Sequence, residues 1–268
     1  MTVEMARVEP RAAIRVPNWA ITAASVVCAL AVWELSGPYI DPLFGSYPSP
    51  ILAAAAQMLR TGELQTAFLE SIQPFFGGLG LAVAAGVPAG LLLGRYRVVE
   101  AAFGIYVTAG YAMPLIALVP LLMLWLDLGF QIKLVIVFLL SFFPICINTW
   151  LGVKAVPKTL IEVGKAFVAP GRAILARIVL PAVLPYIMAG IRLAIGKAVI
   201  AMIVAEFLTS ISGLGGLIYS SAQSFQTAEM FVPIIVVMVF AVALTSFVGW
   251  LERRIAPWQD EIAGESGV

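Results

Sequence analysis

Histidine is absent from the 268-residue sequence, cysteine occurs twice, and charged residues are scarce. Without histidine, histidine-based acid–base catalysis and histidine-ligated metal sites are excluded. Cys28 and Cys146 both lie within apolar runs, as expected for thiols that pack or face lipid without chemistry of their own. Charged residues make up 12% and the net charge is +1. The chain therefore has neither the charged surface of a soluble domain nor the basic character that would point to nucleic acid.

Apolar residues predominate in the sequence. Hydrophobic residues account for 62% of the sequence, and the mean hydropathy is +1.02. A water-soluble fold could not bury this much apolar surface, whereas a lipid bilayer removes the need to bury it. Six apolar runs therefore predict an all-α integral membrane protein with about six transmembrane helices. The predicted spans are residues 19–35, 74–94, 103–126, 132–150, 186–208 and 231–250.

The segments between these runs differ in length and polarity. Residues 36–50 contain four prolines and predict turns, and residues 51–60 predict a short helix that ends near Thr61 and Gly62. Residues 127–130 are expected to form a tight turn. Residues 210–230 are polar and contain glycines, which predicts a loop. The longest charged connection, residues 152–185, separates the fourth span from the fifth.

The distribution of Lys and Arg predicts the orientation, because inner loops of membrane proteins are enriched in both. With the N-terminus inside, twelve of the sixteen basic residues fall in inner segments, and Arg60 and Lys133 in outer ones. Both termini are therefore expected to be cytoplasmic. The first apolar run follows three arginines, as in a signal peptide, but no small-residue cleavage site follows cleanly, so we expect an uncleaved first span.

A glycine pattern marks the second span. Gly86, Gly90 and Gly94 form two overlapping small-xxx-small repeats, which let helix backbones approach closely in lipid. Packing within the chain is the leading interpretation, and a seam between two copies is the alternative. No internal repeat is visible, which argues mildly against a carrier built from inverted repeats.

Residues 157–185 carry an amphipathic pattern. Pro157 suits a helix start, and residues 169–171 (Ala-Pro-Gly) should break that helix. A second short helix is expected from Arg172 to Leu180, stopped by Pro181. Charged residues alternate with an apolar stripe made of Leu160, Ile161, Gly164, Phe167 and Val168. Such a hairpin either lies on a lipid surface or docks into a groove on a partner.

Three charged residues, Arg192, Lys197 and Glu206, fall within the predicted fifth span. Lys197 lies near its middle, where a charge costs about 3 kcal/mol and usually faces the bundle interior. It shares a helical face with Gly190 and with four alanines, so it is expected to point inward, either pairing with a neighbouring helix or lining a pathway. Glu206 is expected near the outer end, in a structural, gating or pathway role. Asn148 and Thr149 are interpreted as polar groups at a helix end.

The chain lacks a phosphate-binding loop. The nearest approach, residues 190–198, has five rather than four residues between its glycines, and Ala198 replaces the hydroxyl residue. Because this stretch also lies within a predicted span, we expect no nucleotide site and no enzymatic activity in this chain.

The hairpin resembles the cytoplasmic signature of ABC importer permeases. That signature reads Glu-Ala-Ala, three residues, Gly, nine residues, Ile, one residue and Leu-Pro. Glu162, Val163 and Gly164 occupy the first three places, and Val168 stands where glycine is expected. Ile178, Leu180 and Pro181 fall in register. Because Val168 is not glycine, we expect that Pro170 and Gly171 could supply the turn slightly later.

The resemblance extends over most of the chain. The stretches SYPSPILAAAAQML, GVPAGLLLGRY, IALVPLLMLWLDLG, SGLGGLI and LERRIAPW resemble the nitrate/sulfonate/taurine branch of these permeases. The resemblance implies a type I importer fold and import of a small, often anionic nutrient by alternating access across a bacterial cytoplasmic membrane. It also implies partners: two cytoplasmic ATPase subunits that use ATP and Mg, a second permease copy (identical or not) and an external binding protein.

The resemblance also implies a division of the chain. Residues 1–18 and 251–268 are expected to be cytoplasmic tails, and residues 19–250 the transmembrane permease domain, with residues 152–185 as its coupling segment. The coupling residues would be Glu162, Val163, Gly164, Phe167, Val168, Pro170, Gly171, Ile178, Leu180 and Pro181. Lys197 and Glu206 are the pathway candidates. A secondary carrier or channel without an ATPase is the alternative, but it would leave the hairpin unexplained. A membrane anchor without transport is a third interpretation, and the polar residues in the spans argue only weakly against it.

Overall fold

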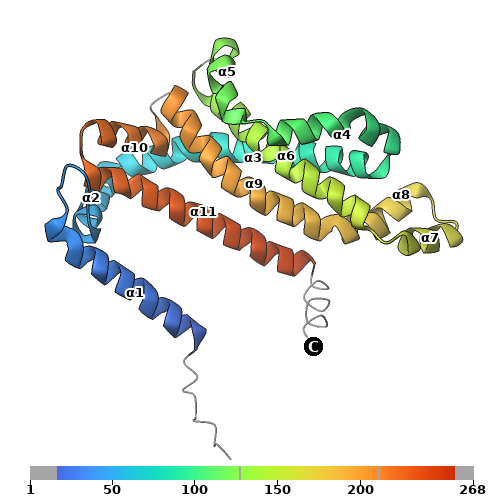
Figure 1. The fold of residues 1–268 in the computed structure, drawn as a ribbon, viewed down its shortest axis with the longest axis horizontal. Coiled ribbons are helices and arrows are strands. Elements are labelled where there is room, and N and C mark those ends of the chain that lie inside the picture. The colour runs from blue at the N-terminus through green and yellow to red at the C-terminus, as the bar shows by residue number, and fades with distance from the viewer. Residues whose placement is uncertain (1–16, 127, 210–211, 257–268) are drawn as a thin grey trace, which may run out of the picture.

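The computed structural model describes residues 17–126, 128–209 and 212–256, and within these ranges every regular element is helical (Figure 1). The α-helices are α1 (Asn18–Ser36), α2 (Pro48–Thr61), α3 (Glu63–Arg95), α4 (Arg97–Ala112), α5 (Val119–Trp125), α6 (Phe130–Ala155), α7 (Lys158–Ala166), α8 (Gly171–Ile174), α9 (Leu180–Thr209), α10 (Gly213–Gln223) and α11 (Thr227–Ile255). Short η1 (Gly37–Tyr39), η2 (Leu115–Leu118) and the π-helical η3 (Leu175–Val179) complete the set.

Five helical segments in the described ranges are long and apolar enough to cross a membrane, and a sixth span results if one bent pair is counted. This confirms the prediction of about six spans. The five segments are Trp19–Tyr39, Glu63–Arg95, Phe130–Ala155, Gly171–Thr209 and Thr227–Ile255. The third predicted span, residues 103–126, is broken rather than one straight helix, because α4 and the helix that follows it meet at 88°. Pro114 causes this break, since it holds Met113 in an extended conformation.

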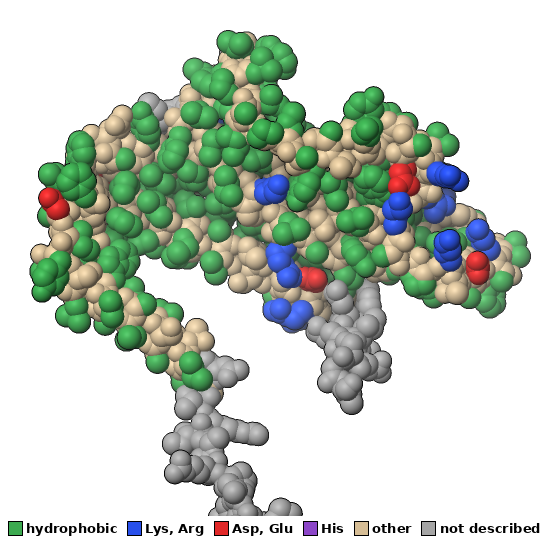
Figure 2. Space-filling model, viewed as in Figure 1, with side chains coloured by type: hydrophobic (Ala, Val, Ile, Leu, Met, Phe, Trp, Pro, Cys, Tyr) green, Lys and Arg blue, Asp and Glu red, His purple; other side chains and the backbone are tan. Residues whose placement is uncertain are grey.

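Helices α3, α6 and α9 form the core and run along the long axis of the molecule, with α11 beside α9 (Figure 1). Their shared interior contains Phe75, Ile136, Ile145, Ile195 and Met202, all fully or almost fully buried. Helix α1 diverges from this core and joins it through α2, where Trp33 donates a hydrogen bond to the Ser46 carbonyl oxygen (3.0 Å). The outer surface in Figure 2 is largely hydrophobic, as expected where lipid replaces water.

The glycine repeat of α3 packs within the chain, as the leading interpretation predicted. Gly90 is buried against α6, and a Cβ there would lie 2.5 Å from the Cys146 carbonyl oxygen and 2.6 Å from the Thr149 Cβ. Gly86 lies similarly close to Ile145. The absence of side chains on this face lets the two backbones approach.

Two predicted boundaries are wrong. Residues 210–230 do not form a loop in their described part, because α10 occupies Gly213–Gln223 and α11 begins at Thr227. Pro181 does not stop the second helix of the hairpin, because the chain remains helical from Gly171 to Thr209. The π-turn of η3 directly precedes Pro181, and there the Leu180 N–H bonds to the Leu175 carbonyl oxygen. This local change of register lets the helix continue through the proline.

Candidate functional site: an exposed hairpin and a buried polar cluster

The hairpin turn begins where α7 ends. The Val168 N–H donates to the Lys165 carbonyl oxygen (2.8 Å), and the Ala169 N–H donates to the Gly164 carbonyl oxygen (3.1 Å). These two bonds are the Schellman pattern, in which the residue just beyond the helix adopts a left-handed conformation. Val168 does so, with φ 54°. The turn therefore lies at Val168, where the family signature has glycine, and the expectation of a later turn at Pro170 and Gly171 is wrong.

The inner face of the hairpin is closed by small and branched residues. Gly164 is buried, and a Cβ added there would lie 2.8 Å from Ile178 Cδ1 and 3.2 Å from Ile174 Cγ1. Arg95, at the end of α3, donates a hydrogen bond to the Gly171 carbonyl oxygen at 3.4 Å. Gly164 and Ile178 thus let α7 pack closely against the following helix, and the Arg95 hydrogen bond links the hairpin to α3.

The outer face of the hairpin is apolar and exposed. Leu160 and Val163 are 46% and 53% exposed, and Phe167 and Val168 are 83% and 88% exposed. Glu162, Pro170 and Gly171 are also exposed, Leu180 is 39% exposed, and Pro181 is half-buried on the helix beyond η3. We call Leu160, Val163, Phe167 and Val168 the apolar tip. Lys and Arg side chains gather at this end of the molecule (Figure 2), so the tip is surrounded by charge.

A second group of polar residues lies inside the helix bundle, around Glu206. The Glu206 side chain is fully buried. It accepts hydrogen bonds from the Ser71 hydroxyl (2.6 Å) and the Gly215 N–H (2.8 Å), and Lys133 Nζ lies 3.5 Å away. Burying one charge alone is expensive, so the opposite charge and two donors stabilise it.

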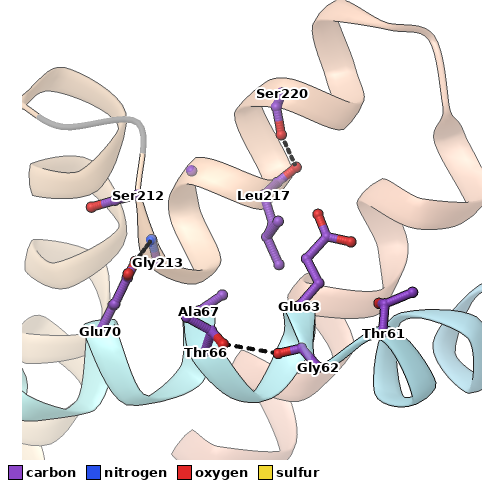
Figure 3. Close-up of a pocket in the computed structure, with 11 residues that line it drawn as sticks. Thr61, Gly62, Glu63, Thr66, Ala67, Glu70, Ser212, Gly213, Leu217 and Ser220 are labelled. Atoms are coloured by element: carbon purple, nitrogen blue, oxygen red, sulfur yellow. Dashed lines mark hydrogen bonds between the residues drawn. The ribbon is translucent and has the colours of Figure 1, made fainter.

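The same cluster binds the N-terminus of α10. The Leu214 N–H donates to the Ser71 hydroxyl oxygen (2.8 Å), and the Gly213 N–H donates to a Glu70 carboxylate oxygen (3.0 Å), as Figure 3 shows for Glu70. With the Gly215 bond to Glu206, three free N–H groups of the first turn are satisfied by side chains from α3 and α9. These bonds explain why a glycine-containing stretch forms a helix.

Lys133, which the sequence count assigned to an outer segment, is buried at the start of a long helix. The residue lies in the first turns of α6, is 4% exposed, and donates a hydrogen bond to the Ser212 hydroxyl at 2.8 Å. Glu70 and Ser71 were missed altogether, since nothing in their local sequence marks them. A pocket of about 460 Å³ adjoins the cluster beside Glu63 and Glu70 (Figure 3), at the end of the molecule opposite the hairpin (Figure 1).

Lys197 lies apart from this cluster. The predicted small-residue face of α9 is buried as expected: Ala194, Ala198, Ala201 and Ala205 are all 0% exposed. Lys197 stands at the edge of that face, half-buried, with its ammonium 4.4 Å from the centre of the Tyr111 ring. On the neighbouring α6, Asn148 donates to the Pro144 carbonyl oxygen (2.8 Å), as a polar group within a helix commonly does.

A multi-pass helical bundle, with an exposed hairpin at one end and buried charges between its helices, has the architecture of a membrane transport subunit. Comparison with known sequences identifies the family. The chain belongs to the binding-protein-dependent transport system inner membrane components, whose sequence profile matches residues 86–257. It is therefore an ABC importer permease of binding-protein-dependent transport.

Similarity to individual proteins supports the same family assignment. A putative ABC transporter permease of Methanocaldococcus jannaschii is 32% identical over 86% of this chain and 89% of its own length. A putative aliphatic sulfonates transport permease of Bacillus subtilis is 30% identical over 88% of this chain and 86% of its own length. Among solved structures, the inward-facing MetNI methionine ABC transporter matches with a TM-score of 0.52 at 19% identity. The match covers 78% of this chain and 97% of the other, and it shows the shared type I importer fold.

Proposed function

We propose that this permease imports a small anionic nutrient and is driven by two ATPase subunits that dock on the apolar tip of the hairpin. The observation that carries the proposal is the exposure of this tip, from Leu160 to Val168, on a hairpin braced from inside. An exposed apolar patch rimmed by charge is typical of a protein–protein contact. A lipid-surface helix would need no such bracing.

The permease itself would hydrolyse no ATP and hold no cofactor, with ATP and Mg bound by the ATPase partner. The stretch that comes closest to a phosphate-binding loop lies within α9, where Gly190 and Ala198 are buried against other helices. Phosphate-binding loops need free backbone N–H groups, and these N–H groups lie inside a continuous helix.

The remaining partners follow from the family. A second permease copy would complete the pathway, an external binding protein would deliver the solute, and the complex would lie in a bacterial cytoplasmic membrane with the hairpin facing inward. The sulfonate permease of B. subtilis, at 30% identity, supports an anionic nutrient. Alternating access would then turn ATP-driven movement of the hairpin into opening and closing of the bundle.

The test compares two phenylalanines of equal exposure at opposite ends of the molecule. Phe167 (83% exposed) lies at the apolar tip, whereas Phe44 (82% exposed) precedes α2. We expect Phe167→Asp to reduce the ATPase that copurifies with the permease at least tenfold, because central apolar contacts carry about 2 kcal/mol or more. Glu162→Lys, which reverses a charge beside the tip, should leave ATP hydrolysis unstimulated by loaded binding protein.

Phe44→Asp is the matched control and should retain the ATPase at the wild-type amount. Equal ATPase recovery with Phe167→Asp and Phe44→Asp would overturn the docking proposal. Size-exclusion chromatography of each permease shows beforehand that both variants are folded.

A further inference from the structure

The break between α4 and α5 leaves non-helical backbone within an apolar span. Met113 is extended, Pro114 has φ −72° and ψ 78°, and the two segments diverge by 88°. Lipid cannot hydrogen-bond to exposed backbone groups, so such breaks are tolerated where they are buried in protein or line a cavity. The N–H groups of Met113, Leu115 and Ala117 bond to Ala109 O (2.9 Å), Met113 O (2.8 Å) and Pro114 O (2.8 Å), but the α-helical bond pattern is interrupted at Pro114, which has no N–H.

A cavity lies at the break. Its volume is about 220 Å³, below the range of about 300–1,000 Å³ that holds drug-sized ligands, which suits a compact solute. The broken segment from Met113 to Ile116 forms one wall, and Leu140 and Phe143 of α6 form another. Lys197 is the one charged residue of the lining, and Tyr111 completes it.

Within the described ranges the charge of Lys197 has no carboxylate partner, in contrast to those of two other basic side chains on the long helices. Lys133 pairs with Glu206, and Arg192 pairs with Glu252. Within the described ranges, no carboxylate forms an ion pair with Lys197, whose ammonium faces only the Tyr111 ring. Lys197 is twelve residues before Thr209, the end of α9, or about 18 Å along the axis, which is deep in a bilayer. A cation there attracts an anion strongly, because little water screens it.

We infer that the cavity formed by Lys197, Tyr111 and the α4–α5 break is a transit site for a compact organic anion. The ammonium would bind the oxyanion group, such as a sulfonate or carboxylate. Phe143 and Leu140 would contact the apolar remainder. The Tyr111 ring would hold the ammonium toward the cavity through its cation–π contact. This inference rests on the proposed import function, and it assigns that function a site within the membrane.

The experiment uses a thiol reagent that carries a sulfonate group as the probe. A cysteine placed at Met113, which is 42% exposed, or at Ile116, 38% exposed, reports on the cavity. Each is reacted, in the reconstituted complex, with 2-sulfonatoethyl methanethiosulfonate and with its trimethylammonium counterpart. After each rate is divided by the rate of the same reagent with a free thiol in solution, the expected result is about a tenfold preference for the anionic reagent. This preference falls to near unity when Lys197→Met is added and persists with Lys197→Arg.

A cysteine at Phe44, which is 82% exposed and precedes α2, is the control, since its reactivity ratio should not depend on Lys197. The proposed site would be overturned if Lys197→Met left the ratio at Met113→Cys and Ile116→Cys unchanged. It would also be overturned if neither cysteine reacted. The outcome is independent of the hairpin test. A Lys197-dependent ratio, together with equal ATPase recovery from Phe167→Asp and Phe44→Asp, would overturn the docking proposal and leave the site standing.

Discussion

At the scale of single residues, Val168 carries a conformation that its side chain disfavours. A β-branched residue at φ 54° is unusual, because its Cβ approaches the neighbouring carbonyl oxygen, at a cost of about 1–2 kcal/mol. The side chain is 88% exposed and so gains nothing from packing inside this subunit. A partner that covers the apolar tip would compensate for this strain, which agrees with a valine in place of the family's glycine.

Replacing Val168 with glycine should stabilise the isolated hairpin. The left-handed conformation is free of strain in glycine, and the net gain after its larger unfolded-state entropy is about 0.5–1 kcal/mol. Hydrogen exchange of the α7 amides should slow by about two- to fivefold. Val163→Gly, a change of the same residue type within α7, should speed exchange instead, because glycine weakens a helix interior. Faster exchange in Val168→Gly would contradict the strain.

At the scale of elements, the contact of α3 with α6 depends on glycines that allow close backbone approach. Gly90 meets the Cys146 carbonyl oxygen, which belongs to a helix backbone and cannot move aside, whereas Gly80 on the same helix has no neighbour within 4 Å. Comparing substitutions at Gly90 and Gly80 therefore distinguishes the effect of lost close packing from the effect of simply replacing a glycine.

Gly90→Ala should therefore destabilise the bundle by about 1–3 kcal/mol, because the new methyl group forces the two helices apart. The measurement is thermal unfolding of the purified permease in detergent, followed by loss of the monodisperse peak. Gly80→Ala is the matched control and should be neutral or slightly stabilising, since alanine favours helix. Similar melting of the two variants would argue against close α3–α6 packing.

At the scale of the whole molecule, the positions of the basic residues define its polarity. Lys and Arg side chains lie at the end that carries α7 and α8 and near the C-terminal end of α11 (Figure 2). Lys133, counted with the outer charges from the sequence, is buried beside Glu206, so it adds no positive charge to the outer surface.

Both termini should lie on the cytoplasmic side. A fluorescent protein that folds only in the cytoplasm should be bright when fused after Val268, and an alkaline phosphatase fusion at the same place should be inactive. A phosphatase inserted at Gly62, in the corner between α2 and α3, should be active and serves as the outward control. An active C-terminal phosphatase would mean that the bent α4–α5 pair does not cross the membrane.

The helices and turns that depend on local chemistry could be predicted from the amino-acid sequence. Runs of apolar residues had to form helices in lipid, because each backbone group there must be hydrogen-bonded within its own segment. The glycine spacing of α3 predicted a close helix contact, and the spacing from Glu162 to Pro181 predicted the hairpin. Gly62, in the left-handed region at φ 81°, ended α2 where expected.

The positions of the charges and the fold of the irregular segments depend instead on packing between distant parts of the chain. Ser71 and Glu206 are 135 residues apart in the chain and meet because α3 and α9 pack together. That meeting buries Lys133 and supplies the bonds that make α10 a helix. The α4–α5 break brings its backbone beside Lys197 in the same way. A partner brought by packing leaves no periodic signal in the local sequence, so neither arrangement could be predicted from it.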